Sequence, residues 1–365
     1  MSYSFLRHID SIFWKKQPIQ LTFFLTRRCN ANCPFCFYLS RDEVRRSSEP
    51  ELSPAEIEKM ASSLGDLLWL AFSGGEIFLR HDLVEVVKIF YTRNRPVIIL
   101  LPTNGLLPEI IYHKTAAILK NCTKSIVTVK LSLDGLEPIH DELRGVPGAF
   151  QKTLATYALL AGLVEQYENF ELGINTVFCA ANQDRMEEII NFVSTLEAAK
   201  THTVSLIRGD VRDGNLKRVD QQKYLQTVAA LEDDLKSKQA TGYRFRGARI
   251  KSAQDIVQRR LIHRTKVEQQ QVIPCSAGRL TVVVTENGDV YPCESFTRHL
   301  GNIKEFDCNL QRLVQSERAA KAAAAIRRKE CYCTHECYMM MNILFNPRLY
   351  PAIFKEYIQI KKSSV

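Results

Sequence analysis

Apolar and polar positions change repeatedly between a strand pattern and a helix pattern along residues 18–209. Short apolar runs bounded by turn-forming residues predict six buried strands, namely Gln20–Thr26, Leu67–Ser73, Val97–Pro102, Ile126–Leu133, Glu171–Phe178 and Thr203–Arg208. Amphipathic stretches between them predict helices near residues 53–64, 82–94, 108–121, 149–167 and 183–199. Repeated alternation of strand and helix predicts an α/β fold with a parallel sheet and right-handed crossovers.

The pattern changes after the sixth strand. Residues 210–270 are polar, with helical stretches near 220–238 and 251–268, and Asn287-Gly288 between two short apolar runs predicts a hairpin. An Ala-rich helix near 316–329 and a last amphipathic stretch follow. We therefore expect five segments: an N-terminal lead (1–17), a core (18–210), a helical bridge (211–270), a small α+β domain (271–340) and a C-terminal amphipathic helix (341–365).

Three cysteines follow the first predicted strand at C-x3-C-x2-C spacing, and they are Cys29, Cys33 and Cys36. Three thiolates on one short loop suit iron better than hard cations. A cubane iron–sulfur cluster has four iron corners, so three cysteines leave one iron open to a small molecule. The alternatives are buried thiols or zinc, but zinc needs a fourth ligand, and no Cys or His follows until His81.

This loop resembles the signature of the radical S-adenosylmethionine (SAM) superfamily, with Phe35 as the aromatic residue before the last cysteine. The resemblance implies that Cys29, Cys33 and Cys36 hold a [4Fe–4S] cluster whose open iron binds the amino and carboxylate groups of SAM. Reductive cleavage of SAM would then yield a 5′-deoxyadenosyl radical that abstracts hydrogen from a substrate. The resemblance also implies that the core is a partial (β/α)6 barrel, similar to a TIM barrel.

Further polar residues follow the other predicted strands, at the edge where parallel sheets bind ligands. Gly74-Gly75-Glu76 matches the family's GGE motif, which implies contact with the amino group of SAM; otherwise such a Glu is a helix-dipole partner. The resemblance also implies that polar groups of strands four to six contact the ribose and carboxylate of SAM, and the candidates are Ser132, Asp134, Arg144, Asn175 and Arg208. The alternatives are turn chemistry for Asp134 and a surface ion pair for Arg144.

A second set of cysteines has the pattern C-x12-G-x4-C followed by C-x-C-x3-C. It resembles the SPASM or shorter twitch extension of radical SAM enzymes, which binds auxiliary clusters, although it lacks the full C-x2-C-x5-C-x3-C pattern and a later cysteine. Five thiols can ligate one [4Fe–4S] cluster but not two. We expect one auxiliary cluster, held by Cys275, Cys293, Cys337 and either Cys333 or Cys331, with a structural zinc as the alternative.

Composition and charge narrow the class of protein. The chain has 365 residues, 45% of them hydrophobic and 24% charged, as in soluble globular enzymes. Eleven cysteines without a visible secretory signal indicate a reducing compartment, so we expect a cytoplasmic protein. No nucleic-acid motif accompanies the net charge of +9. The last helix either packs on the protein or lies peripherally on a membrane, with Lys355, Lys361 and Lys362 at the headgroups.

We therefore expect a radical SAM enzyme, an oxidoreductase or C–H functionalising enzyme whose auxiliary cluster assists oxidation. Since residues 1–19 leave no room for the N-terminal peptide-binding domain of many peptide-modifying relatives, we expect a small molecule, sugar or lipid-linked substrate. The alternatives are a peptide or protein maturase and a non-catalytic iron–sulfur or zinc protein. The expected electron donor is a flavodoxin or ferredoxin. No catalytic acid or base can be identified.

Overall fold

The computed structural model describes residues 2–42, 44, 47–237, 243–245 and 247–360. All six predicted strands are present and pair in chain order as parallel neighbours. They are β1 (Gln20–Thr26), β2 (Trp69–Gly74), β3 (Ile98–Thr103), β4 (Ile126–Ser132), β5 (Phe170–Phe178) and β6 (Thr201–Leu206). The sheet curves without closing, which confirms the expected partial barrel.

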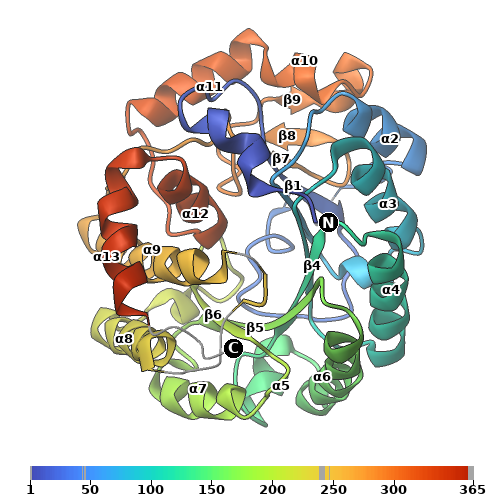
Figure 1. Cartoon of the computed structure of the whole chain (residues 1–365). Helices are drawn as coiled ribbons and strands as arrows, with labels where there is room; N and C mark the ends of the chain where they lie inside the picture. The colour runs from blue at the N-terminus through green and yellow to red at the C-terminus, as the bar shows by residue number, and fades with distance from the viewer. Residues whose placement is uncertain (1, 43, 45–46, 238–242, 246, 361–365) are drawn as a thin grey trace.

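Helices cover the outer face of the curved sheet (Figure 1). They are α2 (Pro54–Ser62), α3 (Leu83–Asn94), α4 (Pro108–Asn121), α6 (Ala149–Gln166) and α7 (Met186–Ser194). A further helix after β4, α5 (Ile139–Arg144), was not expected, because six residues are too few to give a clear helical period. Short 3-10 helices are η1 (Phe5–Ile12), η2 (Ile77–Leu79), η3 (Gln183–Arg185), η4 (Gly214–Lys217), η5 (Ile303–Phe306) and η6 (Pro347–Leu349).

The predicted C-terminal hairpin extends the main sheet. β7 (Thr281–Val284) pairs in parallel with β1, and β8 (Asp289–Tyr291) and β9 (Gly301–Asn302) continue antiparallel. The nine strands have the order β6-β5-β4-β3-β2-β1-β7-β8-β9. The core and the C-terminal segment therefore share one sheet, and the domain limits expected from the sequence stay a prediction.

The open side of the barrel is covered by later helices. Figure 1 shows α9 (Ala248–Glu268), α12 (Glu336–Leu344) and α13 (Tyr350–Gln359) between β6 and the C-terminal strands. The other C-terminal helices are α8 (Gln221–Ser237), α10 (Leu310–Val314) and α11 (Glu317–Arg327). Within the described ranges, every helix is too short or too polar to cross a bilayer.

The expected single helix over residues 341–365 is divided between α12 and α13. The break occurs at Asn346-Pro347, where the Asn346 side chain accepts a hydrogen bond from the Arg348 N–H (3.3 Å) and starts η6. Proline disfavours a helical conformation in the residue before it, so the chain turns there. Lys361 and Lys362 lie outside the described residues.

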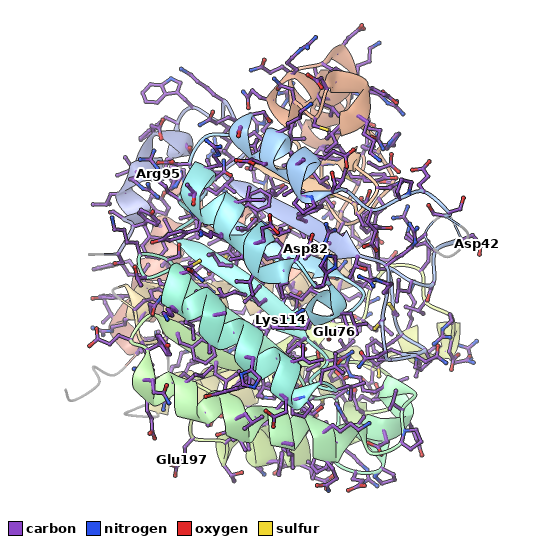
Figure 2. All side chains as sticks on the ribbon, turned by 90° about the vertical axis from the view of Figure 1, so that its right-hand side faces the viewer. Asp42, Glu76, Asp82, Arg95, Lys114 and Glu197 are labelled. Atoms are coloured by element: carbon purple, nitrogen blue, oxygen red, sulfur yellow. The ribbon has the colours of Figure 1, made fainter. Side chains whose placement is uncertain are left out.

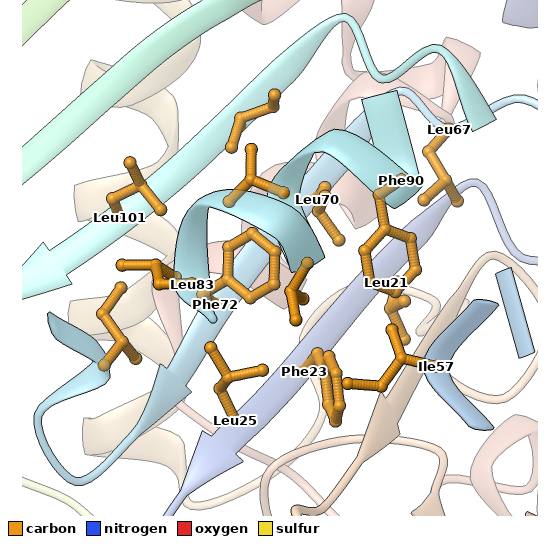
Figure 3. Close-up of a cluster of buried hydrophobic side chains, with 14 of the residues drawn as sticks. Leu21, Phe23, Leu25, Ile57, Leu67, Leu70, Phe72, Leu83, Phe90 and Leu101 are labelled. Carbon is orange, nitrogen blue, oxygen red and sulfur yellow. The ribbon is translucent and has the colours of Figure 1, made fainter. Parts of the chain in front are cut away.

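The largest core cluster lies between the sheet and its outer helices. Figure 3 shows Leu21 and Phe23 of β1 packed with Phe72 of β2 and Phe90 of α3. The three phenylalanine rings lie 6.1 to 6.4 Å apart, centroid to centroid. Each such side chain stabilises the fold by about 1.5–3 kcal/mol on burial. This packing sets the register of β1 and β2, and with it the positions of the loops at their carboxyl ends.

Candidate functional site

A cavity of about 490 Å³ occupies the interior of the curved sheet. Most of the residues predicted to form the functional site line this cavity: Cys29, Cys33, Phe35, Cys36, Gly74, Gly75, Glu76, Ser132, Arg144, Asn175, Arg208 and Cys337. The parallel strands bring these residues together because their carboxyl ends meet at one edge of the barrel. The remaining predicted residues, Asp134, Cys275, Cys293, Cys331 and Cys333, lie behind the cavity wall or in the C-terminal segment.

The three thiols of the loop after β1 are half-buried, and all three residues line the main cavity. Burial raises the pKa of Cys29 to about 11, and the neighbouring Cys33 and Cys36 add to this increase. Backbone N–H groups already point at the sulfurs: Ala31 N donates to Cys29 Sγ and Leu39 N to Cys36 Sγ, both at 3.4 Å. Three thiols at one cavity edge can supply the three protein ligands of a cluster. The raised pKa of Cys29 does not prevent this, because bound iron keeps its thiolates deprotonated.

The cysteine loop is clamped by two other parts of the chain. Asn32 N donates to the carbonyl of Arg144 at the end of α5 (2.8 Å), and Arg212 Nη1 donates to Asn32 Oδ1 (2.6 Å). Gly145 follows with φ 63°, and a Cβ there would lie 2.7 Å from the Asn32 carbonyl oxygen. Sequence reasoning missed Asn32 and Arg212. The Arg144-Gly145 pair was a usable signal for the helix end that Asn32 contacts, since glycine commonly ends a helix.

Asp134 and Arg144 form a buried ion pair, so the alternative of a surface ion pair for Arg144 is wrong. Their side chains are 0% and 8% exposed, and Val177 N donates to the other Asp134 oxygen (2.8 Å). Arg144 Nη1 lies 3.8 Å from Cys33 Sγ, and the guanidinium lies 5.4 Å from the centre of the Phe35 ring. Asp134 therefore reaches the cavity through Arg144, and its expected direct contact with SAM stays a prediction.

Gly74 and Gly75 allow the loop after β2 to touch the cysteine loop. A Cβ on Gly74, which has φ 119°, would lie 2.4 Å from the Thr26 carbonyl oxygen. A Cβ on Gly75 would lie 2.1 Å from the carbonyl oxygen of Arg28. Glycine is thus required for the approach of backbone to backbone at these positions. This packing brings Glu76 close to Cys29.

Glu76 is 1% exposed, and both of its carboxylate oxygens accept hydrogen bonds. The donors are Asn104 N (2.8 Å), Phe78 N (3.1 Å) and Thr103 Oγ1 (3.1 Å), which tie the loop after β2 to the loop after β3. Burial raises the pKa of Glu76 to about 7. Lys114, close to Glu76 in Figure 2, donates to the Phe78 carbonyl (2.9 Å). Direct contact between Glu76 and SAM stays a prediction.

A polar chain links the cavity to the second group of cysteines. Arg208 Nη2 lies 2.7 Å from Glu294 Oε2, which lies 3.0 Å from His335 Nε2, and His335 Nδ1 accepts from Cys337 N (3.1 Å). Burial would raise the pKa of Glu294, but His335 and Arg208 outweigh it and lower the pKa to about 2. Sequence reasoning missed both Glu294 and His335 as site residues. The signal was their position in sequence, beside Cys293 and Cys337.

The second group of cysteines surrounds a small cavity of about 40 Å³, lined by Cys275, Cys293, Cys331 and Cys333. Burial raises the pKa of Cys293 to about 11, and the nearby Cys275 and Cys331 contribute. Four thiols around one space fit a fully ligated [4Fe–4S] cluster. Nowhere in the described part do three or more His, Cys, Asp or Glu side chains converge on one ion position, but a cluster of four separate irons does not require this. Cys337 instead lines the main cavity.

Two family models match the chain. The radical SAM superfamily matches residues 23–193, and an iron–sulfur cluster-binding domain, SPASM, matches residues 275–338. These matches cover the C-x3-C-x2-C loop, the GGE motif and the five cysteines of the second set.

Several curated proteins with different named roles are similar in sequence to this chain. AdoMet-dependent heme synthase of Methanosarcina barkeri is 28% identical over 301 residues, which are 79% of this chain and 80% of the relative. Fe-coproporphyrin III synthase of the same organism is 32% identical, over 53% of this chain and 44% of the relative. The subtilosin biosynthesis protein AlbA of Bacillus subtilis is 26% identical, over 78% of this chain and 57% of the relative. The chain thus spans about half the length of the last two proteins.

Solved structures share the fold. The structure of anSMEcpe with bound AdoMet superposes with a TM-score of 0.61 at 18% identity, over 94% of this chain and 96% of the other. SuiB of Streptococcus suis bound to its precursor peptide SuiA has a TM-score of 0.57 at 16% identity, over 88% and 70%. The family matches, the cavity and the two groups of cysteines agree, and they imply an enzyme that uses SAM, a [4Fe–4S] cluster and an auxiliary iron–sulfur cluster. This chain belongs to the radical SAM superfamily and carries a C-terminal SPASM domain.

Proposed function

We propose that this enzyme oxidises a small molecule by removing hydrogen from an unreactive C–H bond inside the main cavity. When bound, the cluster and SAM supply a carbon radical able to abstract that hydrogen. The main support is that the loop after β1 and the SPASM segment border the same cavity, where Arg208 at the end of β6 pairs with Glu294 of the SPASM segment. A substrate between them has an electron acceptor on its far side, which favours a net oxidation.

We propose Cys29, Cys33 and Cys36 as the ligands of the SAM-binding cluster. Arg144 holds its positive charge against Cys33 Sγ and therefore favours the thiolate form that binds iron. For the auxiliary cluster, the grouping around the smaller cavity favours four of the cysteines: Cys275, Cys293, Cys331 and Cys333. This set differs from the expected one by including both Cys331 and Cys333, and ligation by Cys337 stays a prediction.

We propose that SAM lies along the carboxyl ends of β4 and β5. Ser132 and Asn175 are cross-strand partners there, and Ser205 Oγ donates to Asn175 Oδ1 (3.1 Å), which orients the amide. Arg144 is available at the same edge, and Arg208 lies at the end of β6. Glu76 supports this site by holding the loop that contacts the cysteine loop, so its loss should weaken SAM binding even without direct contact.

The size of the cavity favours a small-molecule substrate. Its volume of about 490 Å³ falls within the usual range for such sites. A relative named for heme synthesis matches 79% of this chain and 80% of its own length, which also favours a small molecule. A peptide or protein substrate is the second candidate, because AlbA is named for bacteriocin biosynthesis and SuiB was solved with its precursor peptide.

Isotope transfer can separate these candidates. The reconstituted enzyme, SAM and a reductant would be incubated anaerobically with extracts of deuterium-grown cells, divided into small-molecule and peptide fractions. If the proposal is correct, deuterium from the small-molecule fraction appears in 5′-deoxyadenosine. Transfer from the peptide fraction alone would instead support a maturase. The enzyme without Cys29, Cys33 and Cys36 serves as the control and should form no 5′-deoxyadenosine.

We also propose a flavodoxin or ferredoxin as electron donor and a cytoplasmic location, because thiolates that bind iron need a reducing compartment. Peripheral contact with a membrane is proposed through α13, where Phe354 and Ile358 are 62% and 61% exposed. Large exposed apolar side chains on an amphipathic helix favour an interface between water and lipid. Flotation with anionic vesicles tests this, and Phe354→Ser should release the protein.

A further inference from the structure

Lys130 places a positive charge inside the main cavity. It lies on β4, two residues before Ser132, so it faces the same side of the strand about 7 Å deeper in the barrel. Its Nζ donates to Thr201 Oγ1 (2.6 Å) and Thr203 Oγ1 (3.1 Å) on β6. Gly173 on the intervening strand β5 leaves room for this reach, because a Cβ there would lie 2.6 Å from Nζ.

Arg259 of α9 brings a second positive charge to the same wall. Its Nη2 makes a long hydrogen bond to the His202 carbonyl (3.4 Å), while its Nη1 is buried and has no hydrogen-bond partner. Arg259 is close enough to Lys130 to lower the pKa of that lysine by repulsion, after the larger effect of burial. In the described part of the chain, neither side chain has a carboxylate partner.

The nearest carboxylate on α9 is already in use. Asp255 pairs with Lys251 through one oxygen and accepts a hydrogen bond from the Tyr243 hydroxyl through the other (2.8 Å). Asp255 favours the charged form of Lys130, and Lys251 opposes part of that effect. Asp255 forms its ion pair with Lys251, and no ion pair joins it to Lys130 or Arg259 among the described residues.

The other acidic group near Lys130 is Glu171 of β5. Its Oε1 accepts from Arg244 N (2.6 Å), and burial raises the pKa of the carboxyl above its usual value. Its charged form is therefore disfavoured. The charges that act on Lys130 come from β5 and α9: Asp255 and Glu171 favour its charged form, and Lys251 and Arg259 oppose it. Together with Lys130 itself, the cations of this group outnumber its two carboxyl groups by one. Such cations cost free energy unless an anion pairs with them.

We infer that Lys130 and Arg259 bind a carboxylate of the substrate, one pleat deeper in the barrel than the site proposed for SAM. A carboxylate can accept two parallel bonds from a guanidinium and one from an ammonium group, which matches the free donors. The substrate class is then a carboxylic acid whose apolar part extends toward the cysteine loop. The inference rests on the proposed function only for the statement that the occupant is the substrate.

Binding of a matched pair of probes tests the site without turnover. The probes are 2-naphthoate and its uncharged analogue 2-naphthamide, titrated by fluorescence against the cluster-loaded enzyme in the presence of SAM. We expect naphthoate to bind about tenfold tighter than naphthamide. Lys130→Met and Arg259→Gln should each remove this preference and leave naphthamide binding unchanged. Lys200→Met is the matched control, since Lys200 lies at the cavity rim and donates to the Glu197 carbonyl (2.7 Å).

A second measurement uses the unaltered protein, in case a variant fails to fold. Burial lowers the pKa of Lys130 to about 8, so its positive charge is lost as pH rises through about 8. The affinity for naphthoate should therefore fall between about pH 7 and 9, whereas that for naphthamide should stay constant. Equal or absent binding of the two probes, or full naphthoate affinity in both variants, would overturn the inference. Failure to form 5′-deoxyadenosine is a separate result, which bears on the proposed function alone.

Discussion

Replacing Arg144 by methionine should destabilise the protein far more than the loss of an exposed arginine. The residue is 7% exposed and pairs with Asp134, which is fully buried. Without the guanidinium, the carboxylate of Asp134 keeps only its bond from Val177 N and is left charged in the interior, or must take up a proton. Removing one partner of a buried ion pair costs about 3–5 kcal/mol.

Urea unfolding followed by tryptophan fluorescence measures this loss. With a slope of about 3 kcal/mol per molar urea, the midpoint should fall by about 1–1.7 M. Asp134→Asn combined with Arg144→Met removes the stranded charge and should recover at least half of the loss. Arg93→Met is the matched control, because Arg93 pairs with Glu58 at the surface (each 49% exposed) and should cost less than about 1 kcal/mol. The reasoning is refuted if the double variant is no more stable than Arg144→Met. It is also refuted if Arg144→Met and Arg93→Met lower the urea midpoint by the same amount.

Four further predictions concern the clusters, the binding of SAM and the pH dependence of stability. Replacing Cys29, Cys33 and Cys36 together by alanine should abolish 5′-deoxyadenosine formation and reduce the iron content after reconstitution from about eight to about four per chain. Unchanged turnover would show that SAM is cleaved elsewhere. Glu76→Ala should weaken SAM binding by about 1.5–3 kcal/mol in calorimetry with unchanged iron content, and full affinity would contradict its role. Burial raises the pKa of Glu76 from 4.5 to about 7, so its stabilising effect is complete below pH 4.5 and is lost as pH rises through about 7. The unfolding temperature should decline over this pH range in the unaltered protein, and Glu76→Gln should lack this decline. Cys331→Ala and Cys333→Ala should each lower the iron content or change the cluster spectrum, and a normal auxiliary cluster in both variants would exclude the proposed ligand set.

The sequence by itself determined the strands of the barrel and the edge at which its ligands gather. Apolar runs of strand length and amphipathic stretches of helix length predict local structure, because each records which face of an element is buried. Parallel strands place their carboxyl ends together, so the cysteine loop and Gly74–Glu76 could be assigned to one edge before any contact was known. The cysteine spacing likewise indicated the iron chemistry, since the ligands of one cluster lie within a single loop.

Only the tertiary structure decided which distant residues meet. It paired β7 with β1, buried Asp134 against Arg144, and brought Lys130 of β4 close to Arg259 of α9. It also placed Cys337 on the wall of the main cavity, whereas Cys275, Cys293, Cys331 and Cys333 line the smaller one. A local pattern specifies the buried face of an element but not the element that covers it. That choice depends on packing between segments far apart in the chain, where side-chain shape and the pairing of buried charges decide which arrangement is stable.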